Sequence, residues 1–100
     1  MIKNYDNVYI LKGSLTEEQA FKEIERAKKY FKNVEVYDKE NDKNGYLGKK
    51  KLAYEIRHET TGYYYLTHFK GNSEDIFEIE KKLRLNDNVL KFITILTEEE

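Results

Sequence analysis

The sequence contains no cysteine and no proline. Without cysteine, disulfide bonds and cysteine-ligated zinc are excluded. Without proline, no rigid linker or proline-marked domain boundary is available. No apolar run approaches the about 18 residues that suggest a membrane span, and the opening residues show no secretory-signal pattern. These absences favour a soluble intracellular protein that depends on its own core for stability.

Aromatic and charged side chains dominate what is present. Aromatic residues make up 14% of the 100-residue chain and charged residues make up 37%. This supply of aromatic side chains argues against intrinsic disorder. A chain of this size can bury roughly 65% of its unfolded surface, which is enough for one core. We therefore predict a single domain over residues 1–96 and a short acidic C-terminal end at 97–100.

Positive charge is concentrated in one stretch of a chain that is otherwise nearly balanced. From Lys43 to His58 there are five lysine or arginine residues and one glutamate, a formal net charge of +4, whereas the whole chain carries −1. A local focus of this kind attracts polyanions whatever the net charge. A simpler explanation is that the three lysines at 49–51 solvate a strand and discourage edge-to-edge pairing.

Hydrophobic periodicity and turn residues divide the chain into six predicted elements. Thr16 and Gln19 fit a capping box at the start of the first helix, and Asn72 or Ser73 is suited to cap the second. In chain order we predict a strand at 5–11, a helix from the Thr16 cap to about 31, a strand region at 33–56 that is one long arm or two short strands, a turn at 58–62, a strand at 63–69, a helix after the 72–73 cap, and a strand at 89–96.

The order of the predicted elements is β-α-β-β-α-β. Right-handed crossovers then give an α+β fold of the ferredoxin-like type, a four-stranded antiparallel sheet with two helices on one face. The opposite face of the sheet is left to solvent or to a partner.

The facing of the strand at 63–69 distinguishes two kinds of RNA-binding protein. Alternation groups Tyr63 and Tyr65 with Phe69, and Phe69 lies between polar residues, so we predict that all three point at the helices. An RNA recognition motif that binds single-stranded RNA would instead turn Tyr63 and Tyr65 outward to stack on bases. Side chains on the open face are expected to lie in water until a protein partner covers them. The predicted protein-partner face consists of Tyr64, Leu66 and His68.

The chain offers little for catalysis or metal binding. His58 and His68 have no cysteine and no neighbouring ligand in the sequence. The segment 38–45 faintly resembles a calcium loop, but either possible start misplaces the glycine or the last ligand, so a polar hairpin turn is favoured. The residues around Gly13 do not form a glycine-rich phosphate loop. We predict no enzyme, no metal site, no cofactor and no small-molecule substrate.

Four stretches together resemble one known family. They are Tyr5-Asp6, residues 48–56, Gly62-Tyr63-Tyr64 and residues 83–91. Their order and spacing resemble bacterial small-subunit ribosomal protein S6 over roughly residues 1–96. The chain departs from that family at Glu55, where proline is common, and at Asn86, where some members are basic.

The resemblance implies a structural protein of the small ribosomal subunit, in the cytoplasm or in an organelle. Members of the family bind small-subunit ribosomal RNA together with ribosomal protein S18, without a membrane. A homodimeric ligand-sensing module on the same fold is a further hypothesis. The residues expected to meet RNA are Lys3, Lys49, Lys50, Lys51, Arg57, Arg84 and Lys91.

Overall fold

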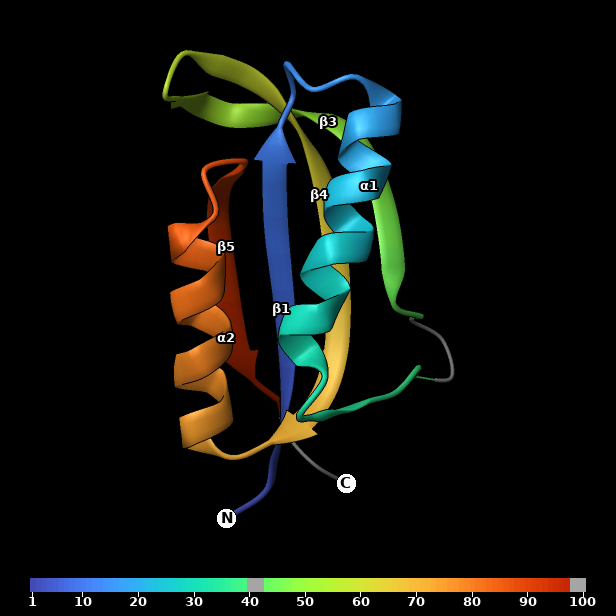
Figure 1. Ribbon diagram of the computed structural model, residues 1–100, viewed down its shortest axis with the longest axis vertical. Helices are drawn as coiled ribbons and strands as arrows, with labels where there is room; N and C mark the ends of the chain where they lie inside the picture. The colour runs from blue at the N-terminus through green and yellow to red at the C-terminus, as the bar shows by residue number, and fades with distance from the viewer. Residues whose placement is uncertain (40–42, 98–100) are drawn as a thin grey trace.

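The computed structural model describes residues 1–39 and 43–97. Of the polar turn predicted at 38–45 and the acidic end predicted at 97–100, residues 40–42 and 98–100 lie outside this description. The elements, drawn in Figure 1, are β1 (Lys3–Lys12), α1 (Glu17–Lys28), the 3-10 helix η1 (Lys29–Phe31), β2 (Glu35–Val36), β3 (Gly45–Ile56), β4 (Glu59–Gly71), α2 (Ser73–Leu85) and β5 (Val89–Leu96).

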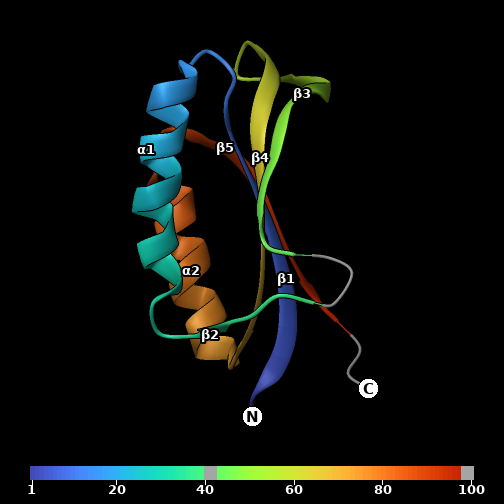
Figure 2. The same ribbon diagram turned by 90° about the vertical axis from the view of Figure 1, so that its right-hand side faces the viewer.

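All the strand pairs are antiparallel and belong to one sheet. β1 lies between β4 and β5, and β4 pairs at its other edge with β2 and β3. Both helices cover the same face, as Figure 2 shows. The predicted ferredoxin-like fold is therefore confirmed. The second predicted strand region is divided, because β2 and β3 occupy successive stretches of the same edge of β4.

Both helices begin with the side chains that their sequences predict. The Thr16 hydroxyl accepts from the Gln19 amide at 3.1 Å, and the Gln19 side chain accepts from the Thr16 amide at 2.8 Å. At the second helix, Asn72 rather than Ser73 is the cap, and it exchanges the same two bonds with Asp75. Each cap satisfies backbone N–H groups that the helix leaves unpaired, which typically contributes about 1 kcal/mol.

The turn between β3 and β4 lies earlier than predicted. Ile56 pairs with Glu59, so the two-residue loop is Arg57-His58 rather than 58–62. Gly62 suggested a turn, yet it lies within β4, where its lack of a side chain serves packing. A Cβ atom there would come within 2.4 Å of the Ile10 side chain, which no real contact allows.

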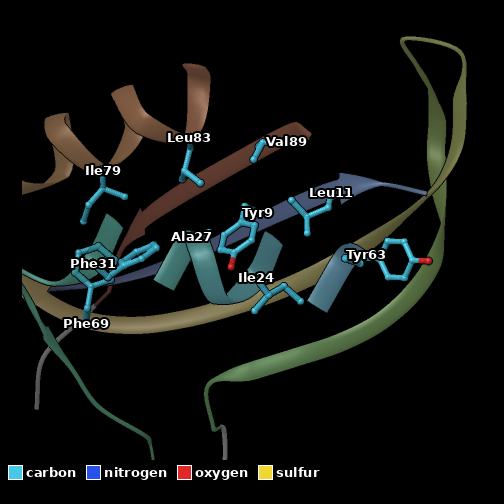
Figure 3. Packing of buried hydrophobic residues seen from close by; sticks show 11 residues of the cluster. Tyr9, Leu11, Ile24, Ala27, Phe31, Tyr63, Phe69, Ile79, Leu83 and Val89 are labelled. Carbon is cyan, nitrogen blue, oxygen red and sulfur yellow. The ribbon is translucent and has the colours of Figure 1, made fainter. Parts of the chain in front are cut away.

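The core lies between the helices and the sheet, where apolar side chains from both layers meet (Figure 3). The rings of Phe31 and Phe69 pack edge to face with centroids 5.5 Å apart. Tyr9 is fully buried beneath the helices, and burial raises the pKa of its hydroxyl above the ordinary value. The buried cluster comprises Tyr9, Leu11, Ala20, Ile24, Ala27, Phe31, Tyr63, Phe69, Ile79, Leu83 and Val89.

Candidate nucleic-acid interface

The three lysines of β3 do not form a single row. Side chains alternate along the strand, and the Lys49 ammonium lies 5.3 Å from the centroid of the Tyr63 ring on the helix side. The Lys50 ammonium lies 5.6 Å from the Tyr64 ring on the open face. Cations held over rings at these distances are attracted by the negative ring face. All three lysines, 49–51, are exposed, so their positive charge is available to a ligand on either side of the sheet edge.

The last part of β3 and the first part of β4 form a hairpin arm. This arm curls across the sheet toward β5 (Figure 1). At its tip, the Arg57 guanidinium donates a hydrogen bond of 2.6 Å to the Val89 carbonyl. Further back, Tyr54 accepts a hydrogen bond of 2.8 Å from the Lys91 ammonium, which also lies 5.1 Å from the Tyr54 ring centroid. These contacts join two regions that are more than 30 residues apart in the sequence.

A hollow lies at the turn between α2 and β5, and Arg57 at the tip of the arm forms part of its lining. The guanidinium carbon of Arg84 lies 5.6 Å from the centroid of the Phe92 ring at this hollow. Its lining carries three cations against one carboxylate, that of Asp87. The hollow has a volume of about 340 Å³ and is lined by Arg57, Leu83, Arg84, Asn86, Asp87, Val89, Leu90, Lys91 and Phe92. The structure therefore gathers Arg57, Arg84 and Lys91, which the sequence alone does not connect.

Lys3 lies apart from the other predicted RNA-binding residues. It is exposed at the start of β1, where it pairs with Gly71. The arm and the turn between α2 and β5, whose residues line the hollow, are toward the opposite end of the sheet, as Figure 1 shows. A single compact ligand therefore cannot engage Lys3 together with the hollow, and the basic interface consists of β3, the arm and the turn between α2 and β5.

The facing predicted for β4 is confirmed. Tyr63 is only 3% exposed and donates a hydrogen bond of 2.7 Å to the Leu15 carbonyl. Tyr65 stacks on Tyr9 beneath the helices with ring centroids 5.4 Å apart. An RNA recognition motif needs both tyrosine rings on the open face. That alternative is therefore wrong for this chain.

The expectation that the predicted partner face lies in water is wrong for two of its three residues. Leu66 is 8% exposed and His68 is fully buried, whereas Tyr64 is half-buried. Leu66 lies between Val8 of β1 and Gly45 of β3. Leu66 is therefore buried on the face of the sheet that the helices do not cover.

A strap of residues from 37 to 39, together with Asn44, lies against His68, and Figure 2 shows the chain after β2 passing to the side of the sheet away from the helices. The Tyr37 amide donates to the His68 carbonyl at 3.0 Å, and the side chain of Asn44 accepts from the His68 amide. Beneath the strap, Nδ1 of His68 lies 2.6 Å from the Asp6 carboxylate, which also pairs with Lys39 at 3.3 Å. His68 is therefore part of a buried polar network and offers no free surface to a partner.

The open face has exposed apolar side chains on β5, which the sequence analysis did not select. Ile93 is 48% and Ile95 is 57% exposed. Ile93 pairs with Val8, and Val8 pairs with Leu66, so an apolar row crosses three strands. Alternation within 89–96 carries this signal, but nearly every residue there is apolar or β-favouring, and the sequence does not mark which set faces outward.

The described part of the chain contains no cluster of three or more potential metal ligands. His58 is almost fully exposed, and its Nδ1 lies 3.4 Å from the Glu55 carboxylate. Across residues 1–39 and 43–97, no helix is both long enough and apolar enough to cross a bilayer.

The ferredoxin-like sheet carries a basic arm beside a hollow lined by cations. These features define the class of protein as one that can attract polyanions.

Comparison with known proteins gives the family. The family model described as Ribosomal protein S6 matches residues 4–96. The chain is 38% identical over 95 residues to the small ribosomal subunit protein bS6 of Helicobacter pylori (strain Shi470), covering 94% of this chain and 64% of that protein. It is 35% identical over 91 residues to the bS6 protein of Sulfurovum sp. (strain NBC37-1), covering 91% and 69%. The chain belongs to the ribosomal protein S6 family, a family of structural rather than enzymatic proteins.

The comparison with solved structures agrees with the fold described above. A crystal structure of 30S ribosomal protein S6 from Thermotoga maritima superimposes with a TM-score of 0.83 and covers 97% of this chain and 89% of that one, at 23% sequence identity. The chain spans about two thirds of the length of the two curated relatives described above.

Proposed function

We propose that this protein is a structural constituent of the small ribosomal subunit that binds small-subunit ribosomal RNA. Membership of the family supports this function, and so do the names of the bacterial relatives. The cytoplasmic ribosome of a bacterium is then its place of action. The observation that carries the proposal is the gathering of basic side chains from β3, the arm and the turn between α2 and β5 at one end of the sheet.

Contacts from this basic end go mainly to phosphates. Lysine and arginine side chains that meet phosphates position a protein on RNA without reading its sequence. Each neutralised phosphate releases counterions, which makes affinity fall as salt rises. The basic end therefore docks the protein on folded RNA, and the shape of that RNA supplies the specificity.

The open face of the sheet binds a protein partner, ribosomal protein S18, in the same assembly. The apolar row from Leu66 through Val8 to Ile93 supports this part of the proposal. Exposed apolar patches commonly mark interaction sites. The contact is centred on β5 and the middle of β1, because the strap already covers His68.

Binding to a small-subunit RNA fragment over a range of salt concentrations tests the RNA contact. Lys50→Gln and Lys51→Gln should each weaken binding and lower the salt slope by about one unit at most. Lys22→Gln is the matched control, because Lys22 is equally exposed on α1 and pairs only weakly with Glu18, at 3.9 Å. Equal slopes for all three variants and the parent would move the RNA contact away from β3.

Co-sedimentation with small subunits from a cell lysate tests the assembly itself. The tagged protein is expected in the small-subunit fraction together with S18. Recovery as a free protein, or with a mixed population of messenger RNA, would contradict the ribosomal function.

A further inference from the structure

The hollow beneath the arm has features that a phosphate-docking surface does not require. Its volume of about 340 Å³ falls in the range of small-ligand sites, which begins at about 300 Å³. Leu83, Leu90 and Phe92 supply apolar lining between the three cations. A phosphate that docks on a flat basic surface needs no such lining. The combination suits a ligand that has both an anionic group and a flat apolar part.

Arg84 provides a surface for the flat part of such a ligand. Its guanidinium lies against the Phe92 ring on one side, and the residue is exposed, so solvent can reach its other side. Arginine planes stack on unpaired bases in RNA complexes. Arg57 lines the same hollow, where its guanidinium is held at the Val89 carbonyl, and it carries the charge that a phosphate needs.

The backbone at Arg57 is a second, independent sign of function. Arg57 has φ of 48° and His58 has φ of 67°. Two-residue hairpin turns with positive φ at both positions strongly favour Asn-Gly, and other residues adopt such angles uncommonly. Backbone conformations of this kind cost energy in residues other than glycine, and they cluster at functional sites. Here the turn holds the Arg57 guanidinium against the Val89 carbonyl at the wall of the hollow.

We propose that this hollow holds one unpaired nucleotide of RNA, with its phosphate at Arg57 and its base on the guanidinium of Arg84. The inference rests on the proposed RNA-binding function and adds to it a contact that captures a base. The contact depends on the presence of a base rather than on which base it is, because stacking on a cation does not distinguish among bases.

An NMR titration of the isotope-labelled protein with AMP tests the hollow without any larger RNA. We expect AMP to shift the backbone amides around 57 and 84–92, and adenosine and inorganic phosphate each to bind at least about tenfold more weakly, since each lacks half of the ligand. Inorganic phosphate that bound as well as AMP would overturn the proposal, and so would AMP shifts confined to 49–51.

Substitutions then assign the roles within the hollow. Arg84→Gln and Arg57→Gln should each weaken AMP binding about tenfold. Lys3→Gln, at the start of β1 and outside the lining of the hollow, is the matched control and should leave it unchanged. A loss of the same size in the control would show that net charge, rather than the hollow, determines binding.

A double variant separates the role of Arg57 from any damage to the fold. Arg57→Asn combined with His58→Gly supplies the favoured turn residues, so the melting temperature should rise while AMP affinity falls. Unchanged AMP affinity in this more stable protein would remove Arg57 from the site.

Binding to ribosomal RNA distinguishes the nucleotide-site proposal from the proposed ribosomal function. If AMP does not bind but the parent still binds the RNA fragment and sediments with small subunits, the nucleotide site is wrong and the ribosomal function stands.

Discussion

The two faces of the sheet bury their side chains by different means. On the helix face, aromatic and aliphatic side chains of β1 and β4 pack against α1 and α2, and Tyr9 and Phe69 lose all contact with water. On the open face there is no helix, yet Ile10, Leu52 and Leu66 are each less than a tenth exposed. Strand neighbours and a short strap exclude water there.

Side chains on one face are buried by the layer of helices, whereas those on the other face are buried by the sheet itself and the strap. At one end of the open face, the strap and the network of His68 and Asp6 close the surface with polar contacts. Along β5, nothing in the described chain covers Ile93 and Ile95. The open face is therefore covered by polar contacts on its β4 side and left exposed along β5. Substitutions in these two parts should have opposite effects on stability and assembly.

Removing Phe69 should have the largest effect, because it lies at the centre of the helix-covered face. Phe69→Ala should lower the free energy of unfolding by about 3–5 kcal/mol through lost burial and the cavity that remains. Its ring contacts both Tyr5 and Phe31, so the cavity cannot easily close. Chemical denaturation measures the loss. A change below about 1 kcal/mol would mean that the helix face is loosely packed.

Leu66 tests whether the open face has a real packing role of its own. Leu66→Ala should lower the free energy of unfolding by about 2–3 kcal/mol, at the low end for a buried leucine, because water can enter the space from the open side. The side chain is 8% exposed, flanked by Val8 and Gly45. Chemical denaturation of the isolated protein gives the value. A nearly neutral result would return Leu66 to the solvated surface that the sequence analysis expected.

The helix caps and the facing of β4 could be predicted from the sequence, because they depend on residues that are close together in the chain. Capping boxes span four residues, and the facing of β4 follows from the alternation around Phe69. The burial of His68 was not accessible, since Asp6 is 62 residues away and Asn44 is 24 away. No local pattern marks a strap whose partners are so distant.

The basic site shows the same division between local and distant information. Charge counting located the lysines of β3, because they are adjacent in the chain. It could not join Arg57 to Arg84 and Lys91, because the curl of the arm brings them together. Gly62 was misread as a turn residue for a related reason: its need for glycine comes from Ile10 on a neighbouring strand.

A substitution in the polar network of Asp6 and His68 should lower the free energy of unfolding less than a substitution of Leu66 does. Asp6→Ala leaves buried His68 without the carboxylate 2.6 Å away, and should lower the free energy of unfolding by about 2 kcal/mol. Asp6→Asn is the control, because its amide oxygen can still accept a hydrogen bond, and it should recover part of the loss. Thermal melts of both variants compare them. Equal melting temperatures for Asp6→Ala and the parent would mean that the strap holds without this pair.

Ile93 should give the smallest change in stability and a clear change in assembly. Ile93→Thr keeps a β-branched side chain on β5, and at 48% exposure it should alter the free energy of unfolding by less than about 0.5 kcal/mol. Pairing with S18 should nevertheless weaken, which co-purification at equal protein concentrations can measure. Full pairing by this variant would place the partner contact elsewhere on the sheet.

The central position of β1 has a consequence for how the chain is made. Lys12 pairs with Gly62 and Tyr5 pairs with Leu96, so both edges of the first strand wait for segments that are synthesised much later. At about 5–20 residues per second, the 50 residues from 13 to 62 take roughly 3 to 10 s to add. In that interval α1 can form from its own cap, whereas β1 leaves the exit tunnel with unpaired backbone on both sides. A nascent chain of this protein is therefore most open to misassociation before β4 has emerged.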